Sequence, residues 1–214
     1  MTRTLPQQLF LLSYNTDKGA LESSSALVRG QLLRAAAVAE LRLSGHLADH
    51  GGKAVRVPGA PEPSDPFLAE VLSVADERPR RWLTVVDHRW HKAEAAVRDH
   101  FAATGAIDVE RRRKLGVFPS LHVELAAPEE AHALRTRLRN LALEGGDLTA
   151  APIEDVALIA IAAEGDVAHA FAWRERRRAK AAFRAVTDRF DAEFPRLRGA
   201  LQMSIAARRT AATG

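Results

Sequence analysis

The segment Ser25–Leu43 constrains the fold of this chain more than any other, because its apolar side chains point to nearly every face of a helix. Its leucine, valine and alanine residues are interrupted mainly by Arg29, Arg34 and Glu40. A helix that is apolar almost all round is stable in water only when other elements surround it. The segment therefore predicts a buried central helix.

The rest of the chain consists mostly of helical patterns bounded by glycine and proline. Pro152–Ala163 is also apolar and is expected beside the first central helix. Strand patterns are confined to two hairpins, at residues 46–57 and at Ile107–Leu125. The other expected helices cover residues 5–12, 65–78, 79–103, 128–143, 166–189 and part of 195–209. The predicted fold class is mostly α: a helical bundle core surrounded by amphipathic helices, with two small β-hairpins, one protruding.

Length and composition fit an ordinary globular protein. The 214 residues are 47% hydrophobic and 27% charged, and a chain of this size needs only one core. We expect a single domain over residues 1–214, with its core at about 5–190 and basic helices at 172–210. Apolar runs such as Val156–Ala163 are far shorter than the roughly 20 residues of a membrane span. The first residues lack the pattern of a secretory signal, which predicts a cytoplasmic protein.

Catalytic and metal-binding patterns are not recognisable in the sequence. The absence of cysteine excludes disulfides, thiolate metal sites and cysteine nucleophiles. The eight histidines lack the spacing of a zinc site, and the glycine pairs lack the other residues of a phosphate-binding loop. Glu154 and Asp155 fit helix capping, and Asp87 with His88 and His91 fits packing or surface chemistry better than a catalytic base. We therefore predict a protein that is not an enzyme and that binds no metal or cofactor.

Positive charge is concentrated near the end of the chain. Residues 172–214 contain eleven basic and four acidic residues, in a chain with a net charge of +4. Such a surplus suits the phosphates of nucleic acid or of anionic lipids. Because helix-turn-helix and zinc-knuckle spacings are missing, nucleic-acid binding is the less favoured alternative. A third alternative is a small-molecule enzyme with a pocket near His88 and His91.

Several collinear segments resemble the Golgi phosphoprotein 3 family, whose bacterial members carry the same domain. The segments are Leu9–Leu12 followed by Asp17–Gly19, Leu27–Gly30 leading into Ala39–Leu47, the turn Gly105–Ile107 before a basic hairpin, and Ala157–Ala160 through Gly165–Val167. Their order and spacing cover about residues 5–189. The resemblance implies a largely helical domain with a protruding β-hairpin, as the hydrophobic pattern does.

The resemblance also implies a peripheral membrane or adaptor protein. Eukaryotic members bind phosphatidylinositol 4-phosphate on Golgi membranes and link membrane-protein tails to vesicle coats. Their lipid pocket uses a tryptophan, an arginine in a Leu-Arg-Gly segment and two arginines three residues apart. Arg29 matches the first arginine, and the later pair falls near His91 and Glu94. The ligand-binding residues implied for an anionic headgroup or phosphate are Arg29, Arg89, His91 and Lys92.

Arg29 has a structural alternative. It lies in an otherwise apolar helix, and a buried guanidinium group needs a neutralising partner whatever the protein does. An internal acid such as Glu40 would satisfy this requirement as well as a bound anion would. The sequence leaves both interpretations open.

The second hairpin is a further candidate surface, because a basic run is followed by apolar residues with little polar cover. We expect it to project from the body and to contact a membrane surface or a second copy of the chain, since exposed apolar tips serve both purposes. A protein client and peripheral contact with the inner face of the cell membrane stay open. The hairpin residues are Arg111, Arg112, Arg113, Lys114, Leu115, Val117 and Phe118.

Overall fold

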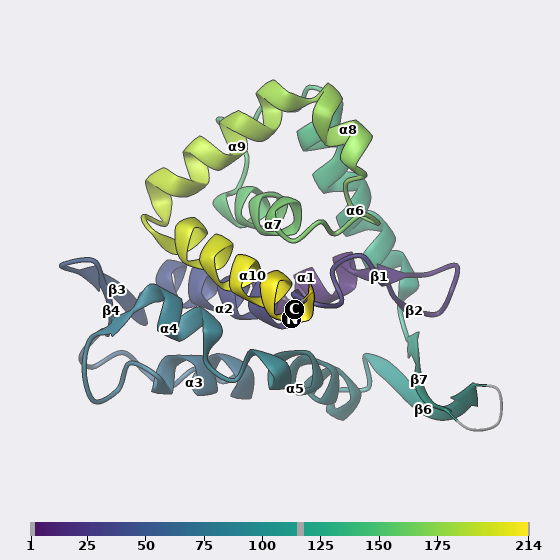
Figure 1. Ribbon diagram of the computed structural model, residues 1–214, viewed down its shortest axis with the longest axis horizontal. Helices are drawn as coiled ribbons and strands as arrows, with labels where there is room; N and C mark the ends of the chain where they lie inside the picture. Colours follow the sequence, from purple (N-terminus) through teal and green to yellow (C-terminus); the bar gives the residue numbers. More distant parts are fainter. Residues whose placement is uncertain (1–2, 115–117, 214) are drawn as a thin grey trace.

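Helices make up most of the molecule, and the strands are short antiparallel sets (Figure 1). The computed structural model describes residues 3–114 and 118–213, except for the side chains of residues 111–121 and 213. The elements are α1 (Leu5–Leu12), β1 (Tyr14–Asn15), β2 (Ala20–Leu21), α2 (Arg29–Leu43), β3 (Leu47–His50), β4 (Lys53–Arg56), α3 (Pro66–Ser73), β5 (Arg80–Arg81), α4 (Trp82–Asp87), α5 (Trp90–Ala103), β6 (Ile107–Lys114), β7 (Phe118–Leu125), α6 (Pro128–Leu143), α7 (Ile153–Glu164), α8 (Trp173–Arg178), α9 (Lys180–Glu193) and α10 (Leu197–Thr213). The predicted mostly α class is confirmed.

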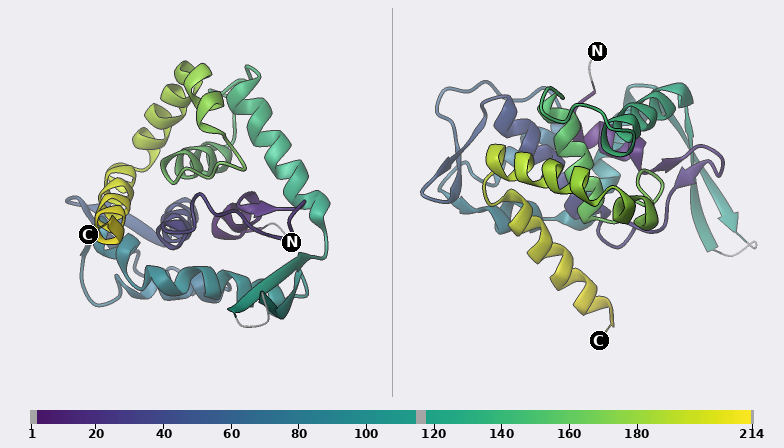
Figure 2. Two further views of the ribbon diagram at one scale, coloured as in Figure 1. Left: turned by 45° about the vertical axis from the view of Figure 1, so that its right-hand side comes forward. Right: turned by 90° about the horizontal axis from the view of Figure 1, so that it is seen from above.

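Helix α2 runs through the centre of the molecule (Figure 2) and is buried along almost its whole length. Helices α1, α3, α4, α5, α7 and α10 all pack against it. Helix α7 is also buried and contacts α1, α6, α9 and α10 besides α2. The two helices predicted to be central therefore are central, and the buried apolar cluster extends from Leu5 in α1 to Ile205 in α10.

Helices α2 and α5 approach each other closely at Gly30. A Cβ atom added to Gly30 would lie 2.1 Å from the carbonyl oxygen of Trp90. Only a residue without a side chain allows the backbone of α5 to come this near. The contact fixes the start of α5 against the start of α2.

Two long helices expected from the sequence are divided in the structure. Residues 79–103 form β5, α4 and α5, and Arg89, with a φ of 45°, separates α4 from α5. Residues 166–189 form a turn at Asp166, which has a φ of 54°, and then α8 and α9, which meet at Ala179. Hydrophobic periodicity averages over many residues and does not report reversals at a single position.

Other helix ends also differ from the expected ones. Helix α2 begins at Arg29 rather than Ser25, because the carboxylate of Glu22 accepts the backbone N–H groups of Ser24 and Ser25 and holds a turn there. Helix α3 ends at Ser73, and α10 continues to Thr213. No helix in the described ranges is both long and apolar enough to cross a bilayer.

Both predicted hairpins are present. Strands β3 and β4 form the first, and β5 joins them as an unexpected third strand. Strands β6 and β7 form the second, which extends beyond the helices (Figure 1). Its base is anchored by the hydroxyl of Tyr14, which donates to the carbonyl oxygen of Val123 at 2.6 Å. A small third pair, β1 with β2, was not expected from the sequence.

Candidate anion-binding site

Arg34 lies in the middle of α2 with no exposed surface. Its Nε donates to the carbonyl oxygen of Val85 at 2.8 Å, and its Nη1 donates to the carboxylate of Glu70 at 2.8 Å. Its Nη2 is buried and has no hydrogen-bond partner among the described residues. Leaving a buried N–H group unsatisfied costs about 1–3 kcal/mol. Arg34 therefore retains the capacity to bind a further acceptor.

A cavity of about 370 Å³ opens beside this arginine, between the end of α3, helix α4 and the start of α5. Glu70 links the cavity to Arg34, because its side chain both lines the cavity and pairs with the guanidinium of Arg34. The Glu70 side chain is 35% exposed, so the ion pair forms the boundary between the core and the cavity. The lining residues are Glu70, Ser73, Val74, Glu77, Arg80, Thr84, His88 and Arg89.

Burial and nearby positive charge both act on His88 in the cavity. Burial and then the charge of Arg34 lower the pKa of His88, while Glu70 opposes them. The charges of Arg89 and Arg80 lower the pKa of His88 further. Burial is also the main reason that the pKa of Arg34 is lowered, against the opposing effect of Glu70. The cavity wall thus combines the guanidinium groups of Arg80 and Arg89 with a histidine whose pKa is lowered, and Arg34 lies behind Glu70.

Arg89 stands at the rim of the cavity and is the N-cap residue of α5. Its backbone is left-handed, and its side chain makes no capping hydrogen bond. A left-handed backbone is uncommon for a residue other than glycine, and such residues are enriched at binding sites. The N-terminus of the fourteen-residue helix α5 adds a partial positive charge at the same place.

The structure brings only one of the four implied ligand-binding residues to this cavity, namely Arg89. His91 and Lys92 lie in the first turn of α5 and are exposed. Trp90, which precedes them, is partly buried, and the guanidinium of Arg208 in α10 lies 4.5 Å from the centre of its indole ring. The ligand-binding roles of His91 and Lys92 stay predictions.

Arg29 is buried and already paired within the fold. Its side chain is 4% exposed, and its Nη1 lies 2.8 Å from the Glu94 carboxylate. Its Nη2 lies 3.6 Å from the carboxylate of Glu22 and donates to the carbonyl oxygen of the same residue. Two internal carboxylates thus neutralise this guanidinium. The geometry favours the structural alternative for Arg29, with Glu22 and Glu94 in place of Glu40, and a ligand-binding role stays a prediction.

In the sequence, Arg34 stands out only as an interruption of the apolar helix. The signal that could have identified it is its position: leucines precede it and alanines follow it in the most buried helix of the chain. The rule that a buried guanidinium needs a partner applies to Arg34 more strongly than to Arg29. The family resemblance implies a ligand-binding role for Arg29 and not for Arg34.

The candidate contact residues of the second hairpin are those at its tip. The side chains of Arg111, Arg112, Arg113, Lys114 and Phe118 lie outside the described residues, as do Leu115 and Val117 entirely. The contact expected for the hairpin tip stays a prediction.

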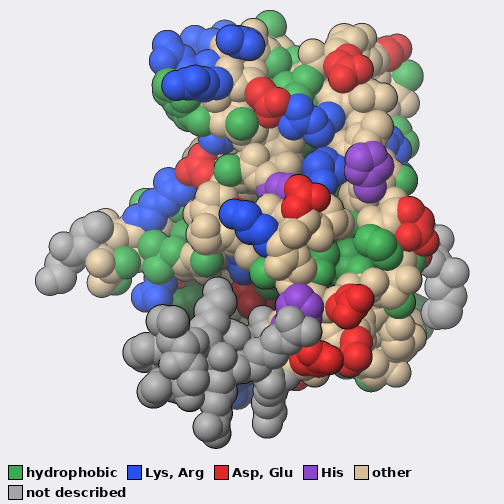
Figure 3. Space-filling view, turned by 90° about the vertical axis from the view of Figure 1, so that its right-hand side faces the viewer, with side chains coloured by type: hydrophobic (Ala, Val, Ile, Leu, Met, Phe, Trp, Pro, Cys, Tyr) green, Lys and Arg blue, Asp and Glu red, His purple; other side chains and the backbone are tan. Residues whose placement is uncertain are grey.

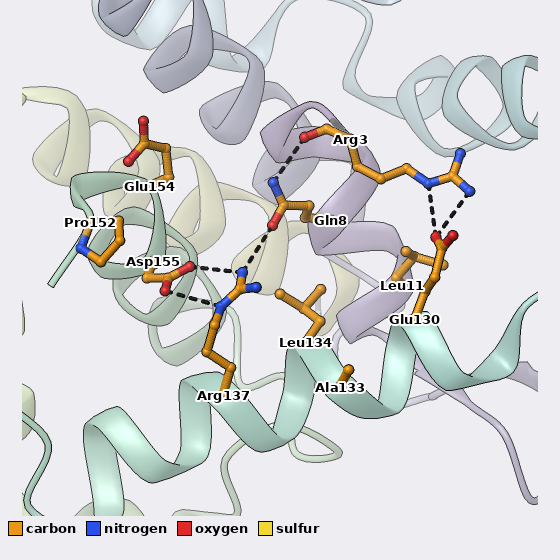
Figure 4. A pocket seen from close by; sticks show the side chains of 10 residues that line it. All are labelled: Arg3, Gln8, Leu11, Glu130, Ala133, Leu134, Arg137, Pro152, Glu154 and Asp155. Atoms are coloured by element: carbon orange, nitrogen blue, oxygen red, sulfur yellow. Dashed lines mark hydrogen bonds and ion pairs between the residues drawn. The ribbon is translucent and has the colours of Figure 1, made fainter. Parts of the chain in front are cut away.

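A larger cavity of about 540 Å³ lies among α1, α6 and α7 (Figure 4), but both of its arginines are paired with carboxylates of the same cavity. Arg137 donates to both oxygens of Asp155, from Nε at 3.1 Å and from Nη2 at 2.9 Å. Arg3 pairs with Glu130 at 3.0 Å. The walls between these pairs are apolar, so this cavity has less capacity for an anion than the one beside Arg34.

Groups that could bind a metal do not converge in the described ranges. No three His, Asp or Glu side chains there could hold a metal ion together. Asp155 pairs with Arg137, and Asp87 accepts a hydrogen bond from Ser204 at 2.6 Å. His88 lines a cavity, as the enzyme alternative requires, but His91 does not.

Comparison with protein families gives one match. The family model described as Golgi phosphoprotein 3 (GPP34) matches residues 5–206. No curated protein matches the chain.

Proposed function

Because the chain belongs to the Golgi phosphoprotein 3 family, we propose that it is a binding protein which holds a phosphate-bearing anion in the cavity beside Arg34. The proposal extends to a peripheral position on a membrane, where the anion is a lipid headgroup. Catalysis is not part of the proposal.

One observation carries the proposal: Nη2 of the fully buried Arg34 has no partner among the described residues, and Glu70, which pairs with Nη1, separates this guanidinium from a cavity that opens to solvent. A guanidinium group matches the oxygens of a phosphate in shape and charge. Its interaction is strong here because the surroundings exclude water and have a low dielectric constant.

The remaining contacts would come from the rim. Arg80 and Arg89 line the cavity from β5 and from the start of α5, and the N-terminus of α5 favours negative charge. The partly exposed Glu70 would have to turn away from Arg34 as the anion enters, which is possible because part of its side chain already faces solvent. The anion would then take the place of an internal carboxylate.

The position of the second hairpin supports a membrane source for the anion. The cavity lies at the start of α5, and β6 begins directly after the end of the same helix. At 1.5 Å per residue, α5 spaces the two by about 20 Å. One flat surface could therefore contact both.

Binding measurements test the proposal and distinguish its two ligand sources. Calorimetry with inorganic phosphate measures the free anion, and co-sedimentation with vesicles containing phosphatidylinositol 4-phosphate measures the lipid. We expect Arg89→Gln to weaken binding at least about tenfold, the scale of one charge-assisted hydrogen bond. Lys53→Gln removes the same charge at an exposed position outside the cavity and should change binding less than twofold. Equal affinities of the two variants, or no binding by the unaltered protein, would overturn the proposal.

A further inference from the structure

Basic side chains surround an exposed tryptophan where α8 passes into α9. We call this surface the basic corner; it consists of Trp173, Arg174, Arg177, Arg178, Lys180 and Arg184, all of them exposed. Trp173 is 59% exposed, although burial of its ring would be favourable. Figure 3 shows Lys and Arg side chains gathered at this upper corner of the molecule.

The positive charge of the basic corner is not neutralised inside the fold. Residues 173–184 contain six basic residues and one acidic residue, Glu175. Glu175 is turned toward Arg139 of α6, which donates to both of its oxygens. Arg176 is turned inward as well and pairs with Asp166. The other five basic side chains face solvent, and the only ion pair seen for them in the described ranges is the 3.9 Å contact of Arg184 with Asp188.

The basic corner lies at the opposite end of the molecule from helices α3, α4 and α5 (Figures 1 and 2). A flat surface in contact with α8 would therefore not reach the cavity beside Arg34. An interaction at the basic corner is independent of the proposed function, and both surfaces could be occupied at once.

We propose that the basic corner docks on the surface of an anionic lipid bilayer. Clusters of four to eight Lys and Arg residues are attracted to anionic headgroups, and the basic corner provides five. A tryptophan ring partitions into the interface between headgroups and acyl chains. Trp173 stands beside Arg174 and Arg177, so one approach to the bilayer would insert the ring while the arginines contact phosphates.

The same chemistry would also attract nucleic acid, but the geometry of Trp173 favours a bilayer. The guanidinium of Arg177 lies 4.8 Å from the centre of the Trp173 ring and covers one of its faces. Stacking of a base on that face would displace Arg177. Insertion of the ring between headgroups keeps this contact intact.

Co-sedimentation with phosphatidylcholine vesicles, with and without phosphatidylserine and free of phosphoinositide, tests the proposal. We expect the unaltered protein to bind only the anionic vesicles and to bind them more weakly as salt rises. The triple variant Arg174→Gln, Arg177→Gln, Arg178→Gln should bind about 100-fold more weakly, because each basic side chain near an anionic surface contributes a factor of about five. The variant Lys53→Gln, Arg78→Gln, Arg81→Gln removes the same charge elsewhere and should bind within a few-fold of the unaltered protein.

Fluorescence gives a second readout that is specific for Trp173. Anionic vesicles should shift the tryptophan emission to shorter wavelength, and Trp173→Phe should abolish this shift, since Trp82 is buried and the partly buried Trp90 lies on α5, at the opposite end of the molecule. The proposal is overturned if the two triple variants bind anionic vesicles equally. It is also overturned if the unaltered protein ignores these vesicles but retards a nucleic acid through Arg174, Arg177 and Arg178. Failure of the Arg34 cavity to bind phosphate would leave these results unchanged.

Discussion

Nη1 of Arg29 lies 2.8 Å from Oε2 of Glu94, and this ion pair joins the start of α2 to α5. Glu94 occupies a position at which the family resemblance implies an arginine. A carboxylate here takes the place of an external anion. The pair favours a structural role for Arg29, and its ligand-binding role stays a prediction.

Arg29→Ala should destabilise the fold by about 3 kcal/mol, because it leaves the buried Glu22 and the partly exposed Glu94 without their cation. Urea denaturation measures the loss. Arg29→Lys keeps the charge and should lose less than half as much. An Arg29→Ala protein with unchanged stability but weakened anion binding would restore the ligand-binding role.

Glu70→Gln should have opposite effects on stability and binding. The change removes the carboxylate partner of the buried Arg34 and should cost about 2 kcal/mol, at the low end for such pairs because Glu70 is partly exposed. It also removes the internal competitor for an anion, so inorganic phosphate should bind several-fold more tightly. Calorimetry at a temperature where the variant is fully folded checks this expectation. Weaker phosphate binding would show that Glu70 does not compete with the ligand.

Gly30→Ala should destabilise the protein although alanine is the better helix former. Its Cβ would overlap the carbonyl oxygen of Trp90 and force α2 and α5 apart. Gly199→Ala is a matched control, because a Cβ at that position of α10 meets nothing within 4 Å. It should stabilise by about 0.5–1 kcal/mol. Thermal unfolding of both variants compares them, and equal shifts would contradict the close contact.

Asp166→Asn should destabilise the protein at neutral pH but not in acid. Burial alone would raise the pKa of Asp166, but hydrogen bonds and charges from Arg176 and Arg209 outweigh it and lower the pKa. The ionised carboxylate therefore contributes stability above the ordinary Asp pKa, and this contribution is lost as pH falls through the lowered value. We expect a deficit of about 1 kcal/mol near pH 7, reduced by solvent screening.

Asparagine is a suitable replacement because it tolerates the left-handed backbone of position 166. Urea denaturation from neutral pH to below the ordinary Asp pKa follows the deficit. A deficit that stays constant over this range would exclude the ion pairs as its cause.

Glu40→Gln should show the opposite pH dependence. Burial raises the pKa of Glu40, and the nearby charges of Glu154 and Asp65 act in the same direction. Folding thus opposes ionisation of this group. The resulting loss of stability is absent below the ordinary Glu pKa and complete above the raised pKa of Glu40. Glutamine can still accept the N–H of Leu5, which donates to Glu40 at 2.8 Å. The variant should unfold at higher temperature than the unaltered protein near pH 7 and at a similar temperature in acid.

The comparison of Arg29 with Arg34 shows how far the sequence can predict the site. Hydrophobic patterning identified α2 and α7 as central because burial follows directly from the period of apolar residues. The same pattern places both arginines in this buried helix, although it is only Arg29 that the sequence analysis singles out as a buried charge. Nε of Arg29 and Nη2 of Arg34 both lack a partner among the described residues. The carboxylates near each guanidinium depend on the packing of other segments: Glu22 after β2 and Glu94 of α5 for Arg29, and Glu70 of α3 for Arg34. Glu94 and Glu70 are distant in sequence from the arginines that they pair with, and no local pattern encodes such contacts.

Ser204 in α10 donates to Asp87 in α4, and 117 residues of chain separate the two. During synthesis on the ribosome, α2 and α4 are therefore complete long before the helix that covers them. Leu197, Leu201 and Ile205 of α10 supply part of the buried core, so the nascent chain exposes an apolar face until these residues emerge. Contacts of such large sequence separation form slowly, and this interval is when the growing chain depends most on protection by a chaperone.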